Sequence, residues 1–317
     1  MSVDWTGRSL GFVGFGTYFP KQVVRLADVV TPSGRTLPEH KLLRLGVRTK
    51  HVADEETVSD MAVHAARRAL EQAGLQGRDI DLVVLSKCTG RWHYTPDLAP
   101  LIAERLDATG AYAFDVSAGC AGFLHGTHIA AAQLAVGGHR RALVIAAEQM
   151  TTRMQPGTPD ALAAGDGACA AVLTTDAQPG RGLLHSLMLS HGEHADALIT
   201  VPPHGWVQTS PKLYGLAAEC QIAAMARILR ESGTDLDEVD WILPHPGSNQ
   251  VRRAVRDHLG PDRRVIDNFE THGNAASASV ATALAESVND GIIGPGDLVL
   301  ATAAGAGWFS GAMLLRV

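Results

Sequence analysis

An amphipathic helix followed by a short apolar strand occurs twice along the chain. Residues 65–85 read AARRALEQAGLQGRDIDLVVL, and residues 224–244 read AMARILRESGTDLDEVDWILP, half a chain length further on. In each copy the helix is expected to end at a glycine, Gly74 or Gly233, because glycine adopts the left-handed conformation that closes many helices. An acidic link and the strand then follow. Two copies in register predict an internally duplicated α/β domain.

The two halves of the chain also end in similar ways. Residues 164–173 (AGDGACAAVL) and 304–317 (AGAGWFSGAMLLRV) both place small residues before an apolar strand. The polar stretch at 174–182 (TTDAQPGRG) is the expected junction, so we assign residues 1–174 to one half and 175–317 to the other. The junction is too short to separate independent domains. We therefore expect two mixed sheets that pack together, with helices between and around them.

Composition and charge exclude several classes of protein. Of the 317 residues 46% are hydrophobic, which is enough for a large core. Acidic residues (33) outnumber Lys and Arg (27), and the net charge of -6 gives no basic field for a nucleic acid. The chain shows neither a run of ~20 apolar residues for a membrane span nor a signal peptide, since Asp4 and Arg8 interrupt the apolar stretch that one needs. We expect a cytoplasmic globular protein that binds neither nucleic acid nor membrane.

The four cysteines provide the first candidate chemistry, and their spacing matches neither a disulfide framework nor a structural zinc site. Cys120 is distinctive because a β-like run (YAFDV) and a small-residue turn (SAG) place it at the start of a long helical stretch. A helix N-terminus favours the nucleophilic thiolate, and the flanking Gly119, Ala121 and Gly122 leave room for a substrate carbonyl. The alternative is a cysteine packed in a strand–helix corner. The others are Cys88 and Cys169, which we interpret as core residues, and Cys220, which stays open.

A cysteine nucleophile needs a base or a polarising partner, and two polar residues qualify. His245 follows the second-copy strand, at the end where α/β folds hold their sites, and Pro244 and Pro246 stiffen its turn. The first-copy residue at the same position is Ser86, so only the second half carries a titratable group there. Asn274 lies on a glycine turn before a small-residue helix, where helix capping is the alternative to catalysis.

The order and context of these residues resemble one known family. The motifs DVSAGCAGF, ILPHPGSN, THGNAASASV and GAGWFSGAMLLRV, with GFVGFGTYFP near the start, look like those of the ketoacyl synthase III group of the thiolase superfamily, nearly end to end. The resemblance implies a homodimer with a thiolase-like fold, layered α-β-α-β-α with two mixed five-stranded sheets. It also implies a catalytic triad of Cys120 from the first half with His245 and Asn274 from the second. By the same resemblance the backbone N–H groups of Cys120 and Ala306 form an oxyanion hole.

The implied reaction is an acyl transfer in two stages. Cys120 attacks an acyl thioester and becomes acylated, a malonyl thioester then loses CO2, and the enolate attacks the acyl group to give a β-ketoacyl thioester. His245 and Asn274 would hold the enolate charge. The substrates would be thioesters of coenzyme A or acyl carrier protein, without cofactor or metal, in fatty-acid-like or specialised polyketide biosynthesis. Two alternatives stay open: acyl transfer to an alcohol or amine of a specialised metabolite, and a non-catalytic partner subunit, against which the intact triad argues.

Several positions depart from the family pattern, and they concern the substrate. His40 stands where the family usually has a tryptophan that grips the adenine of coenzyme A, and HPGSN replaces the usual HQAN. Ala218 and Gln221 replace the asparagine and phenylalanine of the tunnel. By resemblance Thr95 lies at the floor of the acyl pocket, where a threonine in place of phenylalanine predicts tolerance of branched or longer acyl groups. The residues that we expect to bind substrate are Arg44, Thr95, Arg153 and Asn249.

A basic cluster follows the HPGSN motif. Arg252, Arg253 and Arg256 lie on one helical stretch, with Arg252 and Arg256 on the same face. In the family this surface borders the tunnel mouth and docks an acidic acyl carrier protein, so together with His40 it favours a carrier-protein donor over free coenzyme A. A solvated helix face is the alternative. The histidine pairs in HGTH and HGEH lack the context of a metal site, and we expect no metal.

Overall fold

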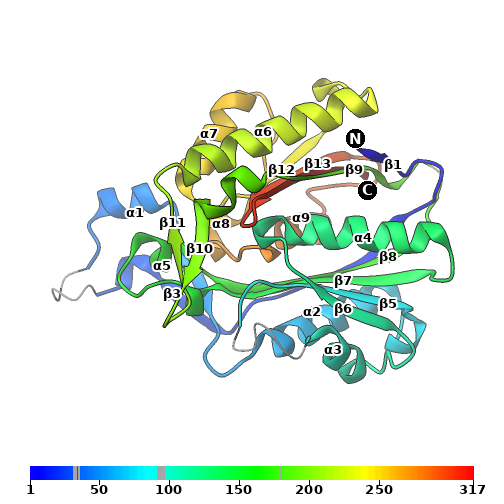
Figure 1. Ribbon diagram of the computed structural model, residues 1–317, viewed down its shortest axis with the longest axis horizontal. Coiled ribbons are helices and arrows are strands. Elements are labelled where there is room, and N and C mark those ends of the chain that lie inside the picture. Colours follow the sequence, from blue (N-terminus) through cyan, green and yellow to red (C-terminus); the bar gives the residue numbers. More distant parts are fainter. Residues whose placement is uncertain (31–33, 35, 91–96, 179) are drawn as a thin grey trace.

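The computed structural model describes residues 1–30, 34, 36–90, 97–178 and 180–317. Within these residues the chain forms two mixed five-stranded sheets that lie face to face (Figure 1). The strands of the first sheet, in order, are β2 (Gly11–Tyr18), β8 (Asp166–Thr174), β7 (Arg141–Gln149), β5 (Leu82–Ser86) and β6 (Tyr112–Val116). Those of the second sheet are β1 (Val3–Asp4), β9 (Gly182–Ser190), β14 (Phe309–Arg316), β13 (Leu298–Gly305) and β12 (Trp241–Pro244).

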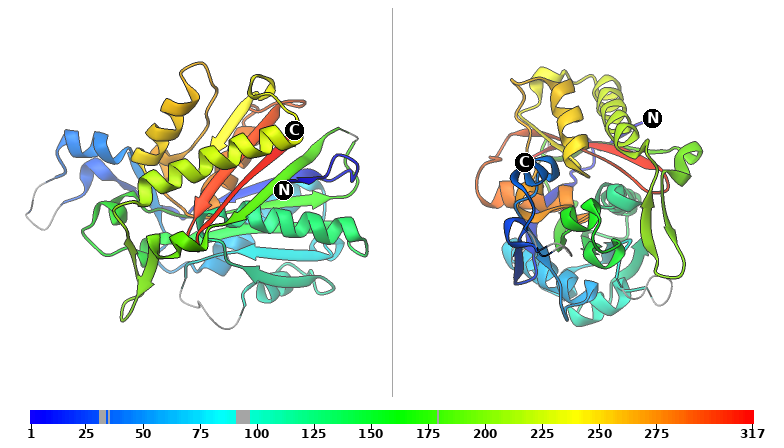
Figure 2. Two further views of the ribbon diagram at one scale, coloured as in Figure 1. Left: turned by 45° about the horizontal axis from the view of Figure 1, so that its top comes forward. Right: turned by 90° about the vertical axis from the view of Figure 1, so that its left-hand side faces the viewer.

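Helices of the described residues form three layers that alternate with the two sheets (Figures 1 and 2). The space between the sheets holds α4 (Gly122–Val136) and α9 (Ala278–Asn289). The outer face of the first sheet carries α2 (Val58–Ala73) and α3 (Ala99–Arg105), and that of the second carries α6 (Leu213–Ser232) and α7 (Asn249–Leu259). Because helices cover both faces, β5, β7 and β8 are buried almost throughout and read as continuous apolar runs. The layered fold expected from the sequence is confirmed.

The sequence repeat corresponds to the same structural unit in each half. Helix α2 ends at Gly74 and α6 ends at Gly233, with left-handed φ angles of 66° and 70°. The strands β5 and β12 follow, and each pairs in parallel with a neighbour in its own sheet. The duplication predicted from the two copies is therefore confirmed.

The two halves differ at the edges of their sheets. Where the first sheet has β6, the second has a single bridge between Ile242 and Val265. Its fifth strand is β1, which pairs with β9 and is held there by Trp5, whose indole N–H donates to the Ser186 hydroxyl at 2.7 Å. The first few residues of the chain, which the sequence assigned to the first half, thus complete the sheet of the second.

The remaining elements gather at one end of the layers, on the left in Figure 1. Helix α4 begins at this end, directly after Cys120. None of the helices in the described part of the chain is long and apolar enough to cross a membrane. The elements at this end are β3 (Gln22–Arg25), α1 (Glu39–Leu45), β4 (Thr49–Val52), α5 (Pro159–Ala163), β10 (Leu198–Val201), β11 (Trp206–Thr209) and α8 (Phe269–His272).

Candidate active site

Cys120 lies in a tight turn between β6 and α4. The turn contains Gly119, whose φ of 53° is in the left-handed region. The loop after β13 packs directly onto it, since a Cβ at Gly305 would lie 2.3 Å from the Cys120 nitrogen. Likewise, a Cβ at Gly119 would lie 2.5 Å from the Ala306 nitrogen, so only glycine fits at either position. The backbone N–H groups of Cys120 and Ala306, the expected oxyanion hole, are neighbours as a result.

His245 is buried directly after β12, with 2% of its surface exposed. Its backbone N–H donates to the Thr302 carbonyl at 2.8 Å, and its carbonyl accepts from the Gln221 side-chain amide at 3.1 Å. Neither ring nitrogen has a hydrogen-bond partner among the described residues. Burial lowers the pKa of His245 to about 4, so the imidazole is neutral at neutral pH.

The side-chain amide of Asn274 is fixed by two hydrogen bonds. Its Oδ1 accepts from the backbone N–H of Ala276 at 2.9 Å, and its Nδ2 donates to the Gly247 carbonyl at 2.9 Å. Its backbone N–H donates to the Ala163 carbonyl at 2.8 Å. With the amide oriented in this way, one N–H of Nδ2 is left to donate to a ligand.

Three loops bring the predicted side chains to one place. The loop after His245 contains Gly247, which bonds Asn274 and where a Cβ would lie 3.6 Å from the His245 Nε2. Cys120 packs in the same apolar cluster as Ala276, two residues after Asn274. The structure therefore assembles Cys120, His245 and Asn274 around one site, as the resemblance implied, while their catalytic roles stay predictions.

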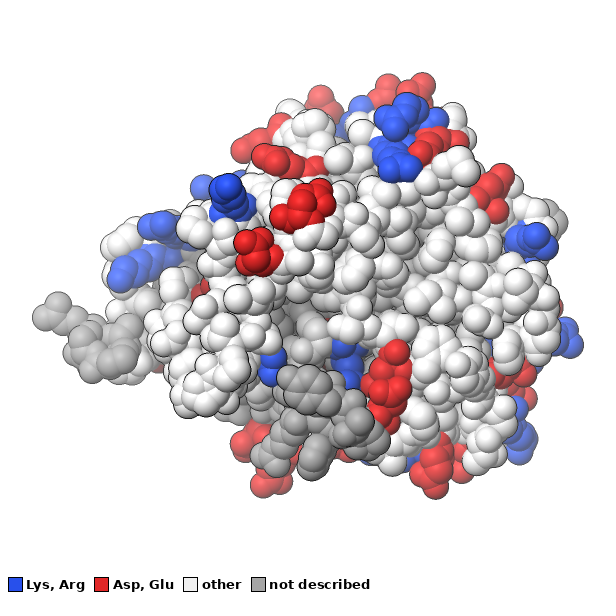
Figure 3. Space-filling view, in the orientation of Figure 1, with Lys and Arg blue, Asp and Glu red and all other residues white. Residues whose placement is uncertain are grey.

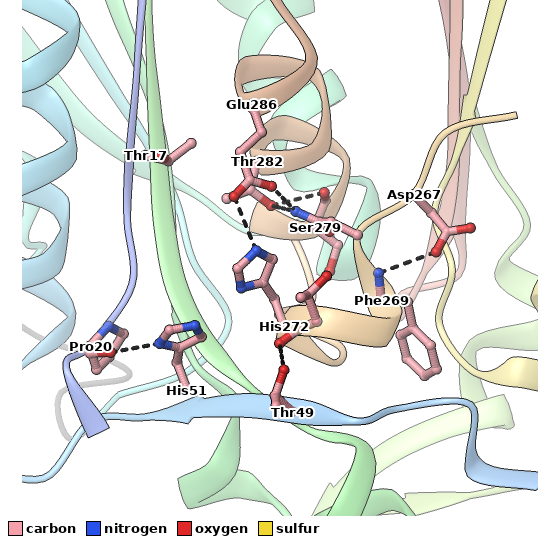
Figure 4. Close-up of polar contacts among 12 residues, drawn as sticks. Thr17, Pro20, Thr49, His51, Asp267, Phe269, His272, Ser279, Thr282 and Glu286 are labelled. Atoms are coloured by element: carbon pink, nitrogen blue, oxygen red, sulfur yellow. Dashed lines mark hydrogen bonds and ion pairs between the residues drawn. The ribbon is translucent and has the colours of Figure 1, made fainter. Parts of the chain in front are cut away.

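Hydrogen bonds join the residues before the Asn274 loop to α9, and Figure 4 shows the one between His272 and Glu286. His272, two residues earlier, donates from Nε2 to the carboxylate of Glu286 in α9 at 3.0 Å, and its ring stacks on Phe19 with 3.8 Å between ring centroids. Asn268 donates to the same carboxylate at 2.7 Å. The residues before the loop are thus joined to the helix after it, which limits how far Asn274 can move.

Cys120 is a neutral thiol in the folded protein. Burial and, to a smaller extent, the charge of Glu148 raise the pKa of Cys120 to about 12. The sequence led us to expect a thiolate, because the helix N-terminus favours it, and the structure corrects that prediction. Removal from water acts on the charged form more strongly than the partial charge of one helix end. The resting site holds a neutral thiol and a neutral imidazole.

A cavity of about 710 Å³ lies beside the loop that follows His245. Its wall is mostly apolar and includes the basic Lys41 and Arg44 of α1. Opposite charge comes from Asp160, whose carboxylate accepts from the Tyr214 hydroxyl at 3.0 Å. Figure 3 shows Lys and Arg side chains gathered at the end of the molecule that α1 forms. The cavity is suited to a long, partly apolar ligand with an anionic end.

The expected substrate-binding residues take different places. Arg44 and Asn249 line the cavity. Asn249 also donates from its amide to the carbonyls of Leu43 and Arg44, at 3.2 Å each, and so holds α7 against the end of α1. Arg153 lies against the β10–β11 hairpin instead. Thr95 lies outside the described residues.

Two of the three arginines expected to dock a carrier protein are ion-paired. Arg252 and Arg256 each place a guanidinium nitrogen 2.9 Å from the carboxylate of Asp267, whose side chain is 2% exposed. Both side chains thus reach the same buried carboxylate, although Arg256 stays 43% exposed. Arg253 is exposed. The basic surface is therefore weaker than the sequence suggested.

Of the other cysteines, two are buried and Cys88 is partly buried. Cys169 is buried in β8, and Cys220 is buried where it accepts from the Trp308 indole N–H at 3.4 Å. Cys88, which we expected in the core, is only partly buried and packs in the same cluster as Cys120. Across the described ranges no group of three His, Cys, Asp or Glu side chains could hold a metal ion.

Sequence reasoning missed Glu148. This residue lies in β7, is fully buried, and accepts a hydrogen bond from Ser277, three residues after Asn274. The signal was present as one acidic residue at the end of the apolar run ALVIAA, since Glu is almost never fully buried without a partner.

Known proteins similar to this chain agree on one family. The family described as 3-oxoacyl-[acyl-carrier-protein (ACP)] synthase III matches residues 114–192, and its C-terminal counterpart matches residues 229–317. A β-ketoacyl-[acyl-carrier-protein] synthase III of Coxiella burnetii is 33% identical over 317 aligned residues, with 96% of this chain and 98% of the relative covered. The enzyme of that name from Salmonella paratyphi A is 34% identical at the same coverage.

Solved structures give the same result. The crystal structure of 3-oxoacyl-[acyl-carrier-protein] synthase III from Aquifex aeolicus superimposes with a TM-score of 0.89 at 31% identity, covering 97% of this chain and 100% of that one. The priming β-ketosynthase of the R1128 polyketide biosynthetic pathway superimposes with a TM-score of 0.86 at 31% identity, covering 98% of this chain and 96% of that one.

Acid should destabilise the fold through His245. The ordinary pKa of 6.5 applies to the unfolded chain and about 4 to the folded one, so the unfolded state takes up the proton first. This contribution to stability is present above pH 6.5 and is lost as the pH falls from 6.5 towards 4. Between pH 8 and pH 5 the wild type should lose about 2 kcal/mol more unfolding free energy than His245→Asn. Urea unfolding at both pH values measures this difference, and equal losses would show that His245 is not held neutral.

Proposed function

Because the chain belongs to the 3-oxoacyl-[acyl-carrier-protein] synthase III family, it is an acyltransferase, and we propose that Cys120, His245 and Asn274 perform its reaction. That reaction is the condensation of an acyl-enzyme with a malonyl thioester in fatty-acid or polyketide biosynthesis. The observation that carries the residue assignment is the hydrogen bond from the Asn274 amide to Gly247, which joins Asn274 to the His245 loop beside Cys120. The relatives are named as β-ketoacyl synthases and a β-ketosynthase, so acyl transfer to an alcohol or amine is not favoured.

In the first stage the Cys120 thiol attacks the thioester carbonyl. Since the thiol and the imidazole of His245 are both neutral, the thiol proton passes to the imidazole as the new C–S bond forms. The backbone N–H groups of Cys120 and Ala306 donate to the oxyanion. When the other C–S bond breaks, the leaving thiolate takes the proton from the imidazolium. The products are an acyl-enzyme and a free thiol.

In the second stage the malonyl thioester oxygen accepts from the free N–H of Asn274 and from the N–H of His245. The bond to the carboxylate breaks, CO2 leaves, and its electron pair forms an enolate whose charge these donors stabilise. The enolate carbon attacks the acyl carbonyl, which forms the C–C bond and expels Cys120 as a thiolate. Uptake of one proton from water restores the thiol.

The substrates enter as thioesters, and we propose that no resident cofactor takes part, because every step uses groups that the chain itself supplies. Lys41 and Arg44 at the cavity suit the phosphate of a pantetheine arm. His40 is exposed and is not part of the cavity wall, so it cannot grip an adenine there as a tryptophan would. This supports a carrier protein as the donor. The free thiols also suit the reducing cytoplasm that we expected.

We propose that the active form is a homodimer joined through β6. Among the described strands, β6 is an edge strand of the first sheet. It is half-exposed along its length although most of its residues (YAFDV) are apolar. An unpaired apolar edge strand is a template for pairing with another chain. Two copies related by a two-fold axis would bury this edge and join their first sheets.

Removal of single catalytic groups should separate the two stages. Cys120→Ala should give no acyl adduct in intact-protein mass spectrometry and yet release CO2 from a malonyl thioester. Asn274→Ala should still acylate Cys120 but release CO2 about 10² to 10³ times more slowly, the effect of losing one oxyanion donor. A wild type that acylates, esterifies an alcohol and never releases CO2 would instead support simple acyl transfer.

Carrier docking should depend on Arg253. Arg253→Glu should slow acyl transfer from an acyl carrier protein, mostly at low salt, because rim charges act on association. Transfer from a small pantetheine thioester should be unchanged. The matched control is Arg230→Glu, an exposed arginine near the end of α6. Arg252→Glu is not a clean test, since it would put a second charge beside the buried Asp267. If Arg253→Glu and Arg230→Glu slow acyl transfer from the carrier protein equally, Arg253 is not part of the docking surface.

Dimerisation should depend on Tyr112. Its side chain is 57% exposed on β6, so Tyr112→Asp should leave the protomer folded and place two carboxylates at the edge shared by the copies. Light scattering after size-exclusion chromatography should show a dimer for the wild type and a monomer for the variant. A variant that stays dimeric would move the interface away from β6.

A further inference from the structure

A buried carboxylate lies behind the proposed catalytic residues and has no part in the steps above. Glu148 is fully buried in β7. In the described part of the chain its partners are hydrogen-bond donors from two other segments. A buried carboxylate is costly unless it is well hydrogen-bonded, so these donors decide its state.

The donors fit the ionised form of Glu148. The backbone N–H of Cys88 is shared between both carboxylate oxygens, at 3.2 Å each, and its thiol lies 3.4 Å from one of them. The hydroxyls of Thr89 and Ser277 also bond the carboxylate. The Thr89 oxygen already accepts from the backbone N–H of Gln149 at 2.7 Å, so its own proton is directed at Glu148. Burial raises the pKa of Glu148, and these hydrogen bonds act against that rise.

The carboxylate also lies where two helices begin. Ser277 is the N-cap residue of α9, a position where a serine usually accepts from the first turn, but here its hydroxyl is turned to Glu148. Gly122 opens α4, and a Cβ there would lie 3.0 Å from the Cβ of Ser277. The positive ends of α4 and α9 therefore converge beside one negative charge.

We propose that Glu148 is a positioning residue whose ionised carboxylate is the shared counter-charge of the two helix N-termini and fixes, through Ser277, the loop that presents Asn274. The inference rests on the proposed function only for the roles of Cys120 and Asn274. The same charge acts on Cys120, where it is the second cause, after burial, of the raised pKa. It acts on Cys88 in the same direction, and Arg153 opposes it there. Glu148 thus links the placement of Asn274 to the protonation of Cys120.

Three variants separate the charge from the hydrogen bond. Glu148→Gln keeps the shape and removes the charge, whereas Ser277→Ala keeps the charge and removes the link to the loop. Asp166→Asn is the matched control, because Asp166 is another fully buried carboxylate that accepts from backbone and hydroxyl donors. Two readouts are needed: the pH dependence of Cys120 alkylation by iodoacetamide, followed by peptide mapping, and the kcat and KM for CO2 release from a malonyl pantetheine thioester.

Glu148→Gln should speed the alkylation of Cys120 at a given pH by about tenfold for each unit by which the pKa falls. Ser277→Ala and Asp166→Asn should leave the alkylation profile in place. Both Glu148→Gln and Ser277→Ala should lower kcat for CO2 release with little change in KM, while Cys120 still takes up an acyl group.

An unchanged alkylation profile in Glu148→Gln would show that the Glu148 carboxyl is protonated in the wild type. It would contradict the proposal that Glu148 is the counter-charge of the two helix N-termini. Unchanged CO2 release in Ser277→Ala would overturn the positioning role. If Glu148→Gln does not fold, Ser277→Ala still decides the second point. A wild type that neither acylates nor releases CO2 would contradict the proposed function, whereas the alkylation comparison would still test Glu148.

Discussion

The direct backbone contact between the Cys120 turn and the loop at Ala306 is the constraint on which the rest of the site depends. The turn belongs to the first half and the loop to the second, and Gly119 and Gly305 leave no side chain between them. The two layers of β-structure must therefore be held at one fixed separation. Helices α4 and α9 act as the spacers, and their apolar surfaces fill the core between the sheets. A change in the packing of either helix would move the two N–H groups apart.

The same burial that protects the site also sets its resting charge. It raises the pKa of the Cys120 thiol and lowers that of the His245 imidazole, so both groups are neutral at rest. In the reaction proposed above, the thiol proton therefore moves only when a thioester is bound. A neutral thiol is also a poor target for oxidants and alkylating agents, because the thiolate is the reactive form.

The sequence allowed the fold and the local setting of each candidate site residue to be predicted where the signal was local or repeated, whereas the joining of these residues in one site was implied by the family resemblance. The turn around Cys120, the strand before His245 and the glycine turn before Asn274 each read correctly from a few neighbouring residues. The errors arose from partners distant in the chain. Asp267 pairs with two arginines whose spacing suggested a basic docking surface, and Glu148 reaches Cys120 only through the folding of the first sheet.

The two copies of the repeat differ at the position of His245. Ser86, the counterpart of His245, lies so close to Gly122 that a Cβ there would be 1.8 Å from its hydroxyl. The position that holds the buried imidazole of His245 in one half is filled in the other by Ser86, packed against the start of α4. Comparison of the two copies therefore singled out His245, because the first copy has a serine at that position. The same comparison gave no information on residues outside the repeat, such as Glu148.

The placement of β1 affects how the chain can fold during synthesis. Val3 pairs with Ser186 of β9, which in turn pairs with the C-terminal strand β14. Residues 3 and 4 thus gain their partner only after more than half of the given chain has been added to them, and β14, the other neighbour of β9, lies further along still. Contacts of such long sequence separation slow folding. The β1 segment therefore stays without its strand partner during synthesis until residues 182–190 have been made.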